Sequence, residues 1–391
     1  MGILEDIRVS RAPALGLASM GMVWAAFAAL VPELKAQIGA GDAAFGASFL
    51  ISSLGALGAM WLAPLADRRF GALSILAAMV ALPVLFLIPA GSGGLILFTM
   101  GMLLTAATSG IGDILMSARI AEIEAVRRRP LMNLNHGIYS FSYAGTAVLT
   151  GLAREAGWSP LQIFAVIGVV IAAISPLMRA PHQRVAGETS ILPRKGAQVL
   201  VWMAGLVFLV GFLTEQAVEG WSALHVERTL GGRPAEGALG PAILGLTMGF
   251  GRLFGQLLAA RISDTLMIAL ACVMSAFGVS LAALAPSIPV AYLGFGIMGL
   301  GISVVVPLSI SLVGRVVPQD QRVAAIGRAS VIGYGAFLVG PSLMGVTSDL
   351  FGLRAAFLLI GILLMLVAAV VVPMISRRIM TDRFSGVRPL P

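Results

Sequence analysis

The amino-acid sequence predicts an all-α membrane protein, with twelve transmembrane helices arranged as two six-helix pseudo-symmetric bundles. The first observation is composition: 58% of the 391 residues are hydrophobic and 11% are charged, whereas a soluble domain carries roughly 25% charged residues. The second is a series of apolar stretches, each long enough to cross a bilayer as a helix of about 20 residues. The third is a polar break halfway along the chain. Since backbone groups in lipid must be satisfied internally, the apolar stretches have to be helical.

Turn and charge signals between the apolar stretches set the expected domain boundaries. We expect an N-terminal bundle over residues 1–178, a cytoplasmic linker over 179–197, a C-terminal bundle over 198–376 and a cytoplasmic tail over 377–391. The polar start of the chain, followed by a full-length span, predicts that no signal peptide is cleaved. The predicted spans are 13–33, 44–65, 72–90, 94–118, 132–152, 160–178, 198–219, 238–259, 265–285, 290–313, 327–346 and 354–375.

Basic residues are distributed unevenly between the two sides of the predicted bundle. Under the positive-inside rule the side richer in Lys and Arg is cytoplasmic, and an even number of spans then places both termini in the cytoplasm, beneath the cell inner membrane. This distribution explains the net charge of +8 without a nucleic-acid partner, because the bases do not gather on a soluble element. The predicted outer loops hold only Lys35, Arg154, Arg228, Arg233 and Arg354.

The two halves repeat each other weakly. Gly58 precedes Asp67 by nine residues at the second span, and Gly255 precedes Asp264 by nine residues at the eighth. Internal repeats are typical of transporters built from two bundles, with the substrate site between them near the midplane. Rocking of the bundles about that site would expose it to either side in turn.

Four segments carry a resemblance to a known family. The loop Asp67-Arg68-Arg69-Phe70-Gly71 resembles the Asp-Arg-x-Gly signature of the major facilitator superfamily, with one inserted residue. Residues 110–140, 215–223 and 333–341 are similar to the fucose-permease-related, YbjJ-like branch, and the resemblance extends over most of the chain. It implies a monomer that moves a small solute, often a sugar, with protons. The chain departs from that pattern at Ser117, Arg119 and Gln256, so the substrate is not carried over.

Ionisable groups inside apolar helices mark the predicted chemistry, because such residues are costly in lipid and face a cavity or a partner. Asp113 belongs to a stripe in the fourth span, where Thr105, Ser109 and Ser117 recur at four-residue intervals and so share one helix face. A carboxyl group placed there can take up and release a proton as the cavity opens to either side. The alternative is a structural carboxylate held by a nearby Arg or backbone donor.

Two further acids, Glu215 and Glu219, lie one turn apart in the seventh span and are followed by Trp221. We predict that both acids take part in proton coupling and that Trp221 stacks on the apolar face of a sugar. The alternative is an interfacial position, where acids reach water and Trp anchors the headgroup region.

Neutral donors and aromatic rings supply the remaining predicted substrate-binding residues, since they suit a polyhydroxylated ligand. Each of them can instead be a packing residue, and His136 can pack against the cytoplasmic gate. The predicted set is Trp24 in the first span, Asn135, His136, Tyr139 and Tyr143 in the fifth, and Tyr334 in the eleventh.

Charged residues near the inner ends of the spans are predicted to act in gating. Asp67, Arg68 and Arg69 would form the cytoplasmic latch that the superfamily signature implies, closing the inner side in the outward-facing state. Arg119 and Arg252 are the other predicted gating residues. Both could also pair with Asp113, bind an anionic substrate or extend their charged ends to the cytoplasm.

The favoured function is proton-coupled symport of a small polar solute, a sugar or a similar compound, by alternating access. Proton-coupled export of drugs or metabolites is the alternative. Exporters often carry a Gly-Pro-x-x-Gly-Gly signature in the fifth span, and residues 143–147 lack it. We expect no enzyme activity, cofactor or metal, because the sequence holds no phosphate loop, Cys/His cluster or nucleophile constellation.

Overall fold

The protein is described here by a computed structural model, which covers residues 3–181, 195–259, 262–317 and 321–384. Throughout these residues the regular structure is helical and contains no strand. The elements are α1 (Ile3–Val9), α2 (Arg11–Gln37), α3 (Asp42–Phe70), η1 (Gly71–Leu73), α4 (Ser74–Ala90), α5 (Leu95–Arg127), α6 (Met132–Glu155), α7 (Pro160–Ile174), η2 (Ser175–Met178), α8 (Lys195–Leu224), η3 (His225–Thr229), α9 (Pro234–Ala259), α10 (Asp264–Ala283), α11 (Ile288–Val316), α12 (Arg322–Leu366), η5 (Val367–Val371) and α13 (Val372–Phe384).

Each of the twelve predicted spans falls on a described helix. Within the described part of the chain, eight helical runs are long and apolar enough to cross a membrane. Two of these runs, Asp42–Ala90 and Ala325–Ile379, contain two predicted spans each, because the helices follow one another without a break in the helical run. Helices α6 and α9, on the spans predicted at 132–152 and 238–259, are not among the eight. The polar residues that α6 carries lower its hydropathy.

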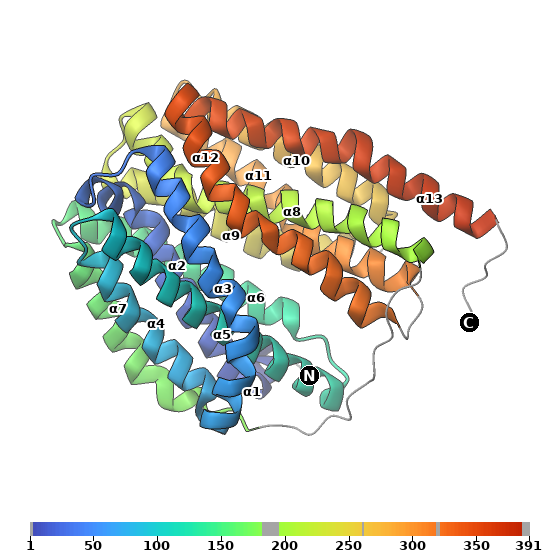
Figure 1. Cartoon of the computed structure of the whole chain (residues 1–391), viewed down its shortest axis with the longest axis horizontal. Helices are drawn as coiled ribbons and strands as arrows, with labels where there is room; N and C mark the ends of the chain where they lie inside the picture. The colour runs from blue at the N-terminus through green and yellow to red at the C-terminus, as the bar shows by residue number, and fades with distance from the viewer. Residues whose placement is uncertain (1–2, 182–194, 260–261, 318–320, 385–391) are drawn as a thin grey trace.

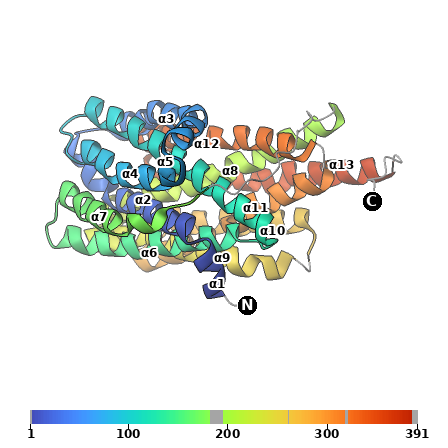
Figure 2. The ribbon, with the colours of Figure 1, turned by 90° about the horizontal axis from the view of Figure 1, so that it is seen from below.

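The helices gather in two groups that follow the order of the chain. Figure 1 shows α2 to α7, in blue to green, on one side and α8 to α13, in green to red, on the other. The view turned by 90° shows the same separation (Figure 2). The predicted linker at 179–197 lies mostly outside the described residues, as does the end of the predicted tail from residue 385.

A single glycine separates the last two predicted spans. Gly352 lies inside α12 with φ 84° and ψ 163°, a backbone conformation that residues with a Cβ rarely adopt. The chain reverses there, so that the end of α12 and the following α13 run back along the bundle (Figure 1). This turn explains why the sequence predicts two spans where one helical run is found.

The two groups of helices pack together at one end, which the charge pattern assigns to the outside and which we call the outer end. It contains residues 38–41, 156–159 and 230–233. There α3 meets α12, where Ser53 Oγ donates a hydrogen bond of 2.6 Å to the carbonyl oxygen of Phe337. Towards the opposite, inner end the same two helices diverge (Figure 1). The halves are therefore closed against each other at the outer end.

A close approach of backbone to backbone at Gly46 makes the α3–α12 contact possible. A Cβ at Gly46 would overlap the carbonyl oxygen of Pro341 and lie 3.1 Å from Cα of Gly345. We predict that Gly46→Ala lowers the melting temperature of the detergent-purified protein by several degrees, because overpacking typically costs about 1–3 kcal/mol. The matched control is Gly58→Ala on the same helix, where a Cβ meets open space. Equal melting temperatures for the two variants would contradict the prediction.

Candidate functional site

Seven ionisable or polar side chains from both halves form a group that we call the central polar cluster. All are half-buried except Tyr334, which is 40% exposed. They come from α5 and α6 of the first half and from α8, α9 and α12 of the second. The members are Asp113, His136, Tyr139, Glu215, Glu219, Arg252 and Tyr334.

Arg252 on α9 joins the two halves within the cluster. Its Nη1 donates a hydrogen bond of 2.9 Å to Ser140 Oγ on α6, and its Nη2 lies 3.9 Å from Glu215 Oε1 on α8. Ser140 lies one helical turn from His136, which is within electrostatic range of the same guanidinium group. Arg252 thus contacts a hydroxyl of one half and a carboxylate of the other.

Glu219 faces the tyrosines of α6. Its Oε2 accepts a hydrogen bond of 3.0 Å from Gln216 Nε2, a residue that the sequence analysis did not single out. Glu219 interacts electrostatically with both Tyr139 and Tyr143. Tyr143 is 1% exposed and its hydroxyl has no hydrogen-bond partner among the described residues, so it lies behind Tyr139 in the packed interior.

Asp113 on α5 is the remaining acid of the central polar cluster. Tyr139 and, across the junction of the halves, Tyr334 both lie within its electrostatic range. Over the described residues Asp113 makes no hydrogen bond or ion pair, and its role in proton coupling stays a prediction. One turn away, Ser109 Oγ accepts a hydrogen bond of 2.8 Å from Trp24 Nε1, so the half-buried Trp24 lies beside the helix face that carries Asp113.

Besides Tyr143, two more predicted substrate-binding residues lie in the packed interior. Asn135 is fully buried, and its Nδ2 donates to Ser10 Oγ at 3.1 Å and to the Leu131 carbonyl at 2.8 Å. It therefore fastens the start of α2 to α6. Trp221 is 2% exposed and packs edge-on against Phe45 across the two halves, with ring centroids 5.9 Å apart. In this conformation neither side chain has surface to offer a ligand.

Four of the five predicted gating residues lie at the inner end of the first half, and the fifth, Arg252, belongs to the central polar cluster. Asp67 Oδ1 accepts hydrogen bonds from Arg119 Nη2 at 2.7 Å and from Ser74 Oγ at 3.2 Å. Arg119 also reaches Glu122, so it pairs with these two acids rather than with Asp113. Arg68 and Arg69 are exposed, and Arg69 lies over the ring of Phe70. A role of these residues in gating stays a prediction.

An ion-pair network at the outer end was missed by the sequence analysis. Arg154 on α6 makes a bidentate pair with Glu227 in η3, at 2.7 and 3.1 Å. Asp42 at the start of α3 pairs with Arg228 of the other half at 2.8 Å and is only 4% exposed. The sequence places these charges in or beside outer loops, but their pairing depends on residues 73 and 186 positions apart.

The arrangement combines half-buried carboxylates with hydroxyl and aromatic groups at the junction of the halves. Carboxylates can exchange protons, and the hydroxyls can exchange hydrogen bonds with a solute. Because these groups come from both halves, a relative movement of the halves would change the spacing among them. The outer ion pairs would break in the same movement.

Comparisons with known proteins identify relatives over nearly the whole chain. The sequence profile described as Major Facilitator Superfamily matches residues 204–386. An uncharacterised MFS-type transporter of Yersinia pestis is 30% identical, over 93% of this chain and 94% of that protein. The membrane protein MosC of Rhizobium meliloti is 27% identical, over 87% of this chain and 84% of that protein.

Solved structures with low sequence identity share the fold. A D-xylose–proton symporter has a TM-score of 0.76 at 15% identity, covering 95% of this chain and 97% of that one. A bacterial homologue of the human lysosomal transporter Spinster, in an inward-facing and unoccupied conformation, has a TM-score of 0.72 at 15% identity, covering 99% and 100%. Together with the helical architecture, these likenesses confirm the predicted fold class.

Proposed function

Because this chain belongs to the Major Facilitator Superfamily of transporters, we propose that it moves a small polar solute, a sugar or a similar compound, across the bacterial inner membrane in symport with protons. The observation that carries the proposal is that Arg252 contacts Ser140 of the first half and Glu215 of the second, within the central polar cluster. A solute bound there contacts both halves and can follow their movement. The fold likeness to a D-xylose–proton symporter is compatible with this proposal.

The proton-coupling part rests on the carboxylates of the cluster. Asp113 has no polar partner among the described residues, and Glu219 has an uncharged one in Gln216. Acids without a basic partner in a membrane are costly when charged. Each therefore gains from binding a proton whenever water leaves the site, which links occupancy by the solute to proton uptake. Glu215 is less suited to proton coupling, because the positive charge of Arg252 lies 3.9 Å from its carboxylate.

We propose that the inner latch, residues 67–69, and the outer ion pairs act as the two gates of the transporter. In this conformation the outer end is closed by Arg154–Glu227 and Asp42–Arg228, and Asp67 is bound to Arg119 of its own half. We propose that this is the inward-facing state of the cycle. In the outward-facing state the segment 67–69 would close the inner end.

A panel of ligands tests the substrate class. Sugars, polyols, sugar acids, nucleosides and lipophilic cations would be added to detergent-purified protein while its melting temperature is recorded. A ligand that binds the folded state stabilises it by RT ln(1 + [L]/Kd), so a dose-dependent rise identifies a candidate. A rise with hydroxyl-rich neutral solutes supports the proposal, and the absence of any such rise argues against it.

Export of lipophilic cations is the second candidate, because the three acids of the cluster outnumber Arg252. Tyr334 also lies in an aromatic group, with ring centroids 5.8 Å from Phe212 and 6.0 Å from Phe337, which offers faces for a cation. A rise in melting temperature with lipophilic cations alone would select this function.

Substitution of Arg252 should weaken binding of the ligand that the melting-temperature panel identifies. Arg252→Gln should raise its Kd at least tenfold, equivalent to about 1.4 kcal/mol, because the side chain that links Ser140 to Glu215 loses its charge and most of its donors. Isothermal titration of wild type and variant measures this change. The matched control is Arg378→Gln, an exposed arginine on α13. A Kd unchanged in both variants would place the solute elsewhere.

A further inference from the structure

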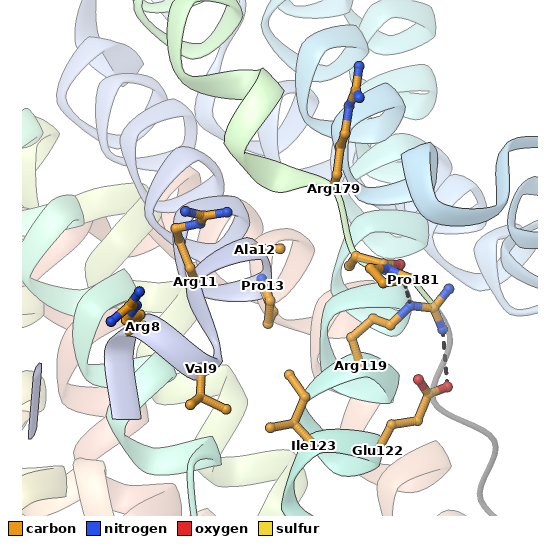
Figure 3. A pocket seen from close by; sticks show the side chains of 11 residues that line it. Arg8, Val9, Arg11, Ala12, Pro13, Arg119, Glu122, Ile123, Arg179 and Pro181 are labelled. Carbon is orange, nitrogen blue, oxygen red and sulfur yellow. Dashed lines mark hydrogen bonds and ion pairs between the residues drawn. The ribbon is translucent and has the colours of Figure 1, made fainter. Parts of the chain in front are cut away.

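A second polar pocket lies at the inner end of the first half, away from the central polar cluster. It has a volume of about 140 Å³ and lies between α1, the first turn of α2, the inner part of α5 and the segment that follows η2 (Figure 3). The lining residues are Arg8, Val9, Arg11, Ala12, Pro13, Arg119, Glu122, Ile123, Arg179, Ala180 and Pro181.

The pocket carries an excess of positive charge. Arg119 pairs with two acids, Asp67 and Glu122, so these three side chains together carry one negative charge. Arg8, Arg11 and Arg179 are exposed, and none of the three forms an ion pair or hydrogen bond with a residue that the structure describes. Even with the one acid that exceeds the charge of Arg119, these three arginines leave the surroundings of the cavity positively charged, which favours an anion there.

The surroundings of the pocket are those of a membrane interface. Arg11 and Arg179 directly flank the predicted spans 13–33 and 160–178 on the predicted cytoplasmic side. Val9, Ala12, Pro13 and Ile123 give the same cavity an apolar part. Basic pockets at this level on the cytoplasmic side meet the headgroups of anionic lipids, which are enriched in that leaflet.

The floor of the pocket is held in place by the protein itself. Arg119 Nε donates a hydrogen bond of 3.3 Å to the Ala180 carbonyl, and the Ala180 amide donates one of 2.9 Å to the Ala72 carbonyl. The segment that carries Arg179 is thereby fixed against the first half. The guanidinium groups of Arg8, Arg11 and Arg179 point in different directions (Figure 3). Exposed side chains rotate within nanoseconds, so they can turn towards an anion in the cavity.

We propose that this pocket binds a phosphate group, supplied by the headgroup of an anionic phospholipid or by a free phosphate. Guanidinium groups bind phosphate oxygens through paired, charge-assisted hydrogen bonds. The apolar lining beside the arginines fits a phosphodiester that carries acyl chains. The site does not depend on the identity of the transported solute.

Lipid binding to the purified full-length protein tests the site. Native mass spectrometry and melting temperature would be recorded with phosphatidylglycerol, with phosphatidylcholine and with inorganic phosphate alone. We expect phosphatidylglycerol to bind and to raise the melting temperature more than phosphatidylcholine does. Binding of inorganic phosphate that displaces the lipid would support the same site and identify free phosphate as its ligand. Absence of binding by both phosphatidylglycerol and phosphate would overturn the proposal.

Two triple variants that remove the same number of arginines distinguish lipid binding at this pocket from attraction to positive surface charge in general. The triple variant Arg8→Gln, Arg11→Gln, Arg179→Gln should weaken phosphatidylglycerol binding at least tenfold. The control, Arg127→Gln, Arg128→Asn, Arg378→Gln, removes three exposed arginines that do not line the pocket, and Asn tolerates the positive φ of Arg128. Equal weakening in both triple variants would overturn the proposal. The single variants Arg8→Gln and Arg179→Gln, each expected to lose about threefold or more, provide the test if the triple variant does not fold.

Discussion

Asp113→Asn should abolish proton-driven accumulation of the solute while leaving its binding measurable. The amide keeps the size and polarity of the side chain, and Asp113 has no polar partner among the described residues whose loss would disturb the fold. For a one-proton symporter, a gradient of one pH unit supplies about 1.4 kcal/mol and sustains roughly tenfold accumulation. The variant should bring that ratio down to about one. Uptake of radiolabelled solute into proteoliposomes with an imposed pH gradient measures the ratio.

Solute exchange without a gradient distinguishes loss of coupling from loss of binding. Wild type and Asp113→Asn should both exchange internal for external solute, since the cavity is retained. The matched control is Asp349→Asn, an exposed acid at the outer end, which should accumulate solute like wild type. Full accumulation by Asp113→Asn would show that this carboxylate is not essential for coupling. Glu219 would then be the next carboxylate to substitute.

Breaking the outer ion pair between Arg154 and Glu227 should shift the protein towards the outward-open state. The Arg154 side chain is 5% exposed and its bidentate contact joins the two halves, so Glu227→Ala removes an interaction that we expect only while the outer end is closed. Truncating one partner of a buried pair costs on the order of 2 kcal/mol or more, equivalent to a roughly thirtyfold shift in the ratio of the two states.

Labelling of a single introduced cysteine measures the shift. Ser53→Cys places a thiol of nearly the same size at the α3–α12 contact, where Ser53 is 8% exposed. The native Cys272 is fully buried and should contribute little background. Glu227→Ala should raise the rate of maleimide labelling at position 53 several-fold. The matched control Asp349→Ala removes an outer acid that joins no ion pair among the described residues, and it should leave the rate unchanged.

A double-mutant cycle decides whether the pair itself is responsible. If Arg154→Ala and Glu227→Ala each increase labelling and the double variant increases it no further, the two residues act through their mutual contact. Additive effects would mean that they stabilise the closed outer end separately. Labelling as slow as in the parent protein for every variant would show that the network does not hold the gate.

The all-helical membrane fold followed from the sequence because the decisive property is local. A stretch of about 20 apolar residues must form a helix in lipid whatever its neighbours are. All twelve predicted spans lie on helices for this reason. The proposed coupling residues were chosen in the same way, since Asp113, Glu215 and Glu219 stand out as charges within apolar stretches.

The tertiary structure decided which of those polar groups face one another. From the sequence, Arg119 and Arg252 were equally plausible partners for Asp113. In the structure Arg119 pairs with Asp67, 52 residues away. Arg252 instead contacts Glu215 and Ser140. The structure also showed that Asn135, Tyr143 and Trp221 lie in the packed interior. Hydropathy does not encode such pairings, because they depend on the rotation and approach of helices that are distant in the chain.

The ion pairs at the outer end are the clearest example of contacts that the sequence did not predict. Lys35, Arg154, Arg228 and Arg233 were predictable as outer charges from their loops, and each of them forms an ion pair at that end. Their partners were not predictable, since three of these pairs join residues from opposite halves. The sequence by itself determined that this protein is a bundle of membrane-spanning helices with acids in its interior. Only the tertiary structure determined that its outer end is closed, because that closure consists of contacts between the two halves.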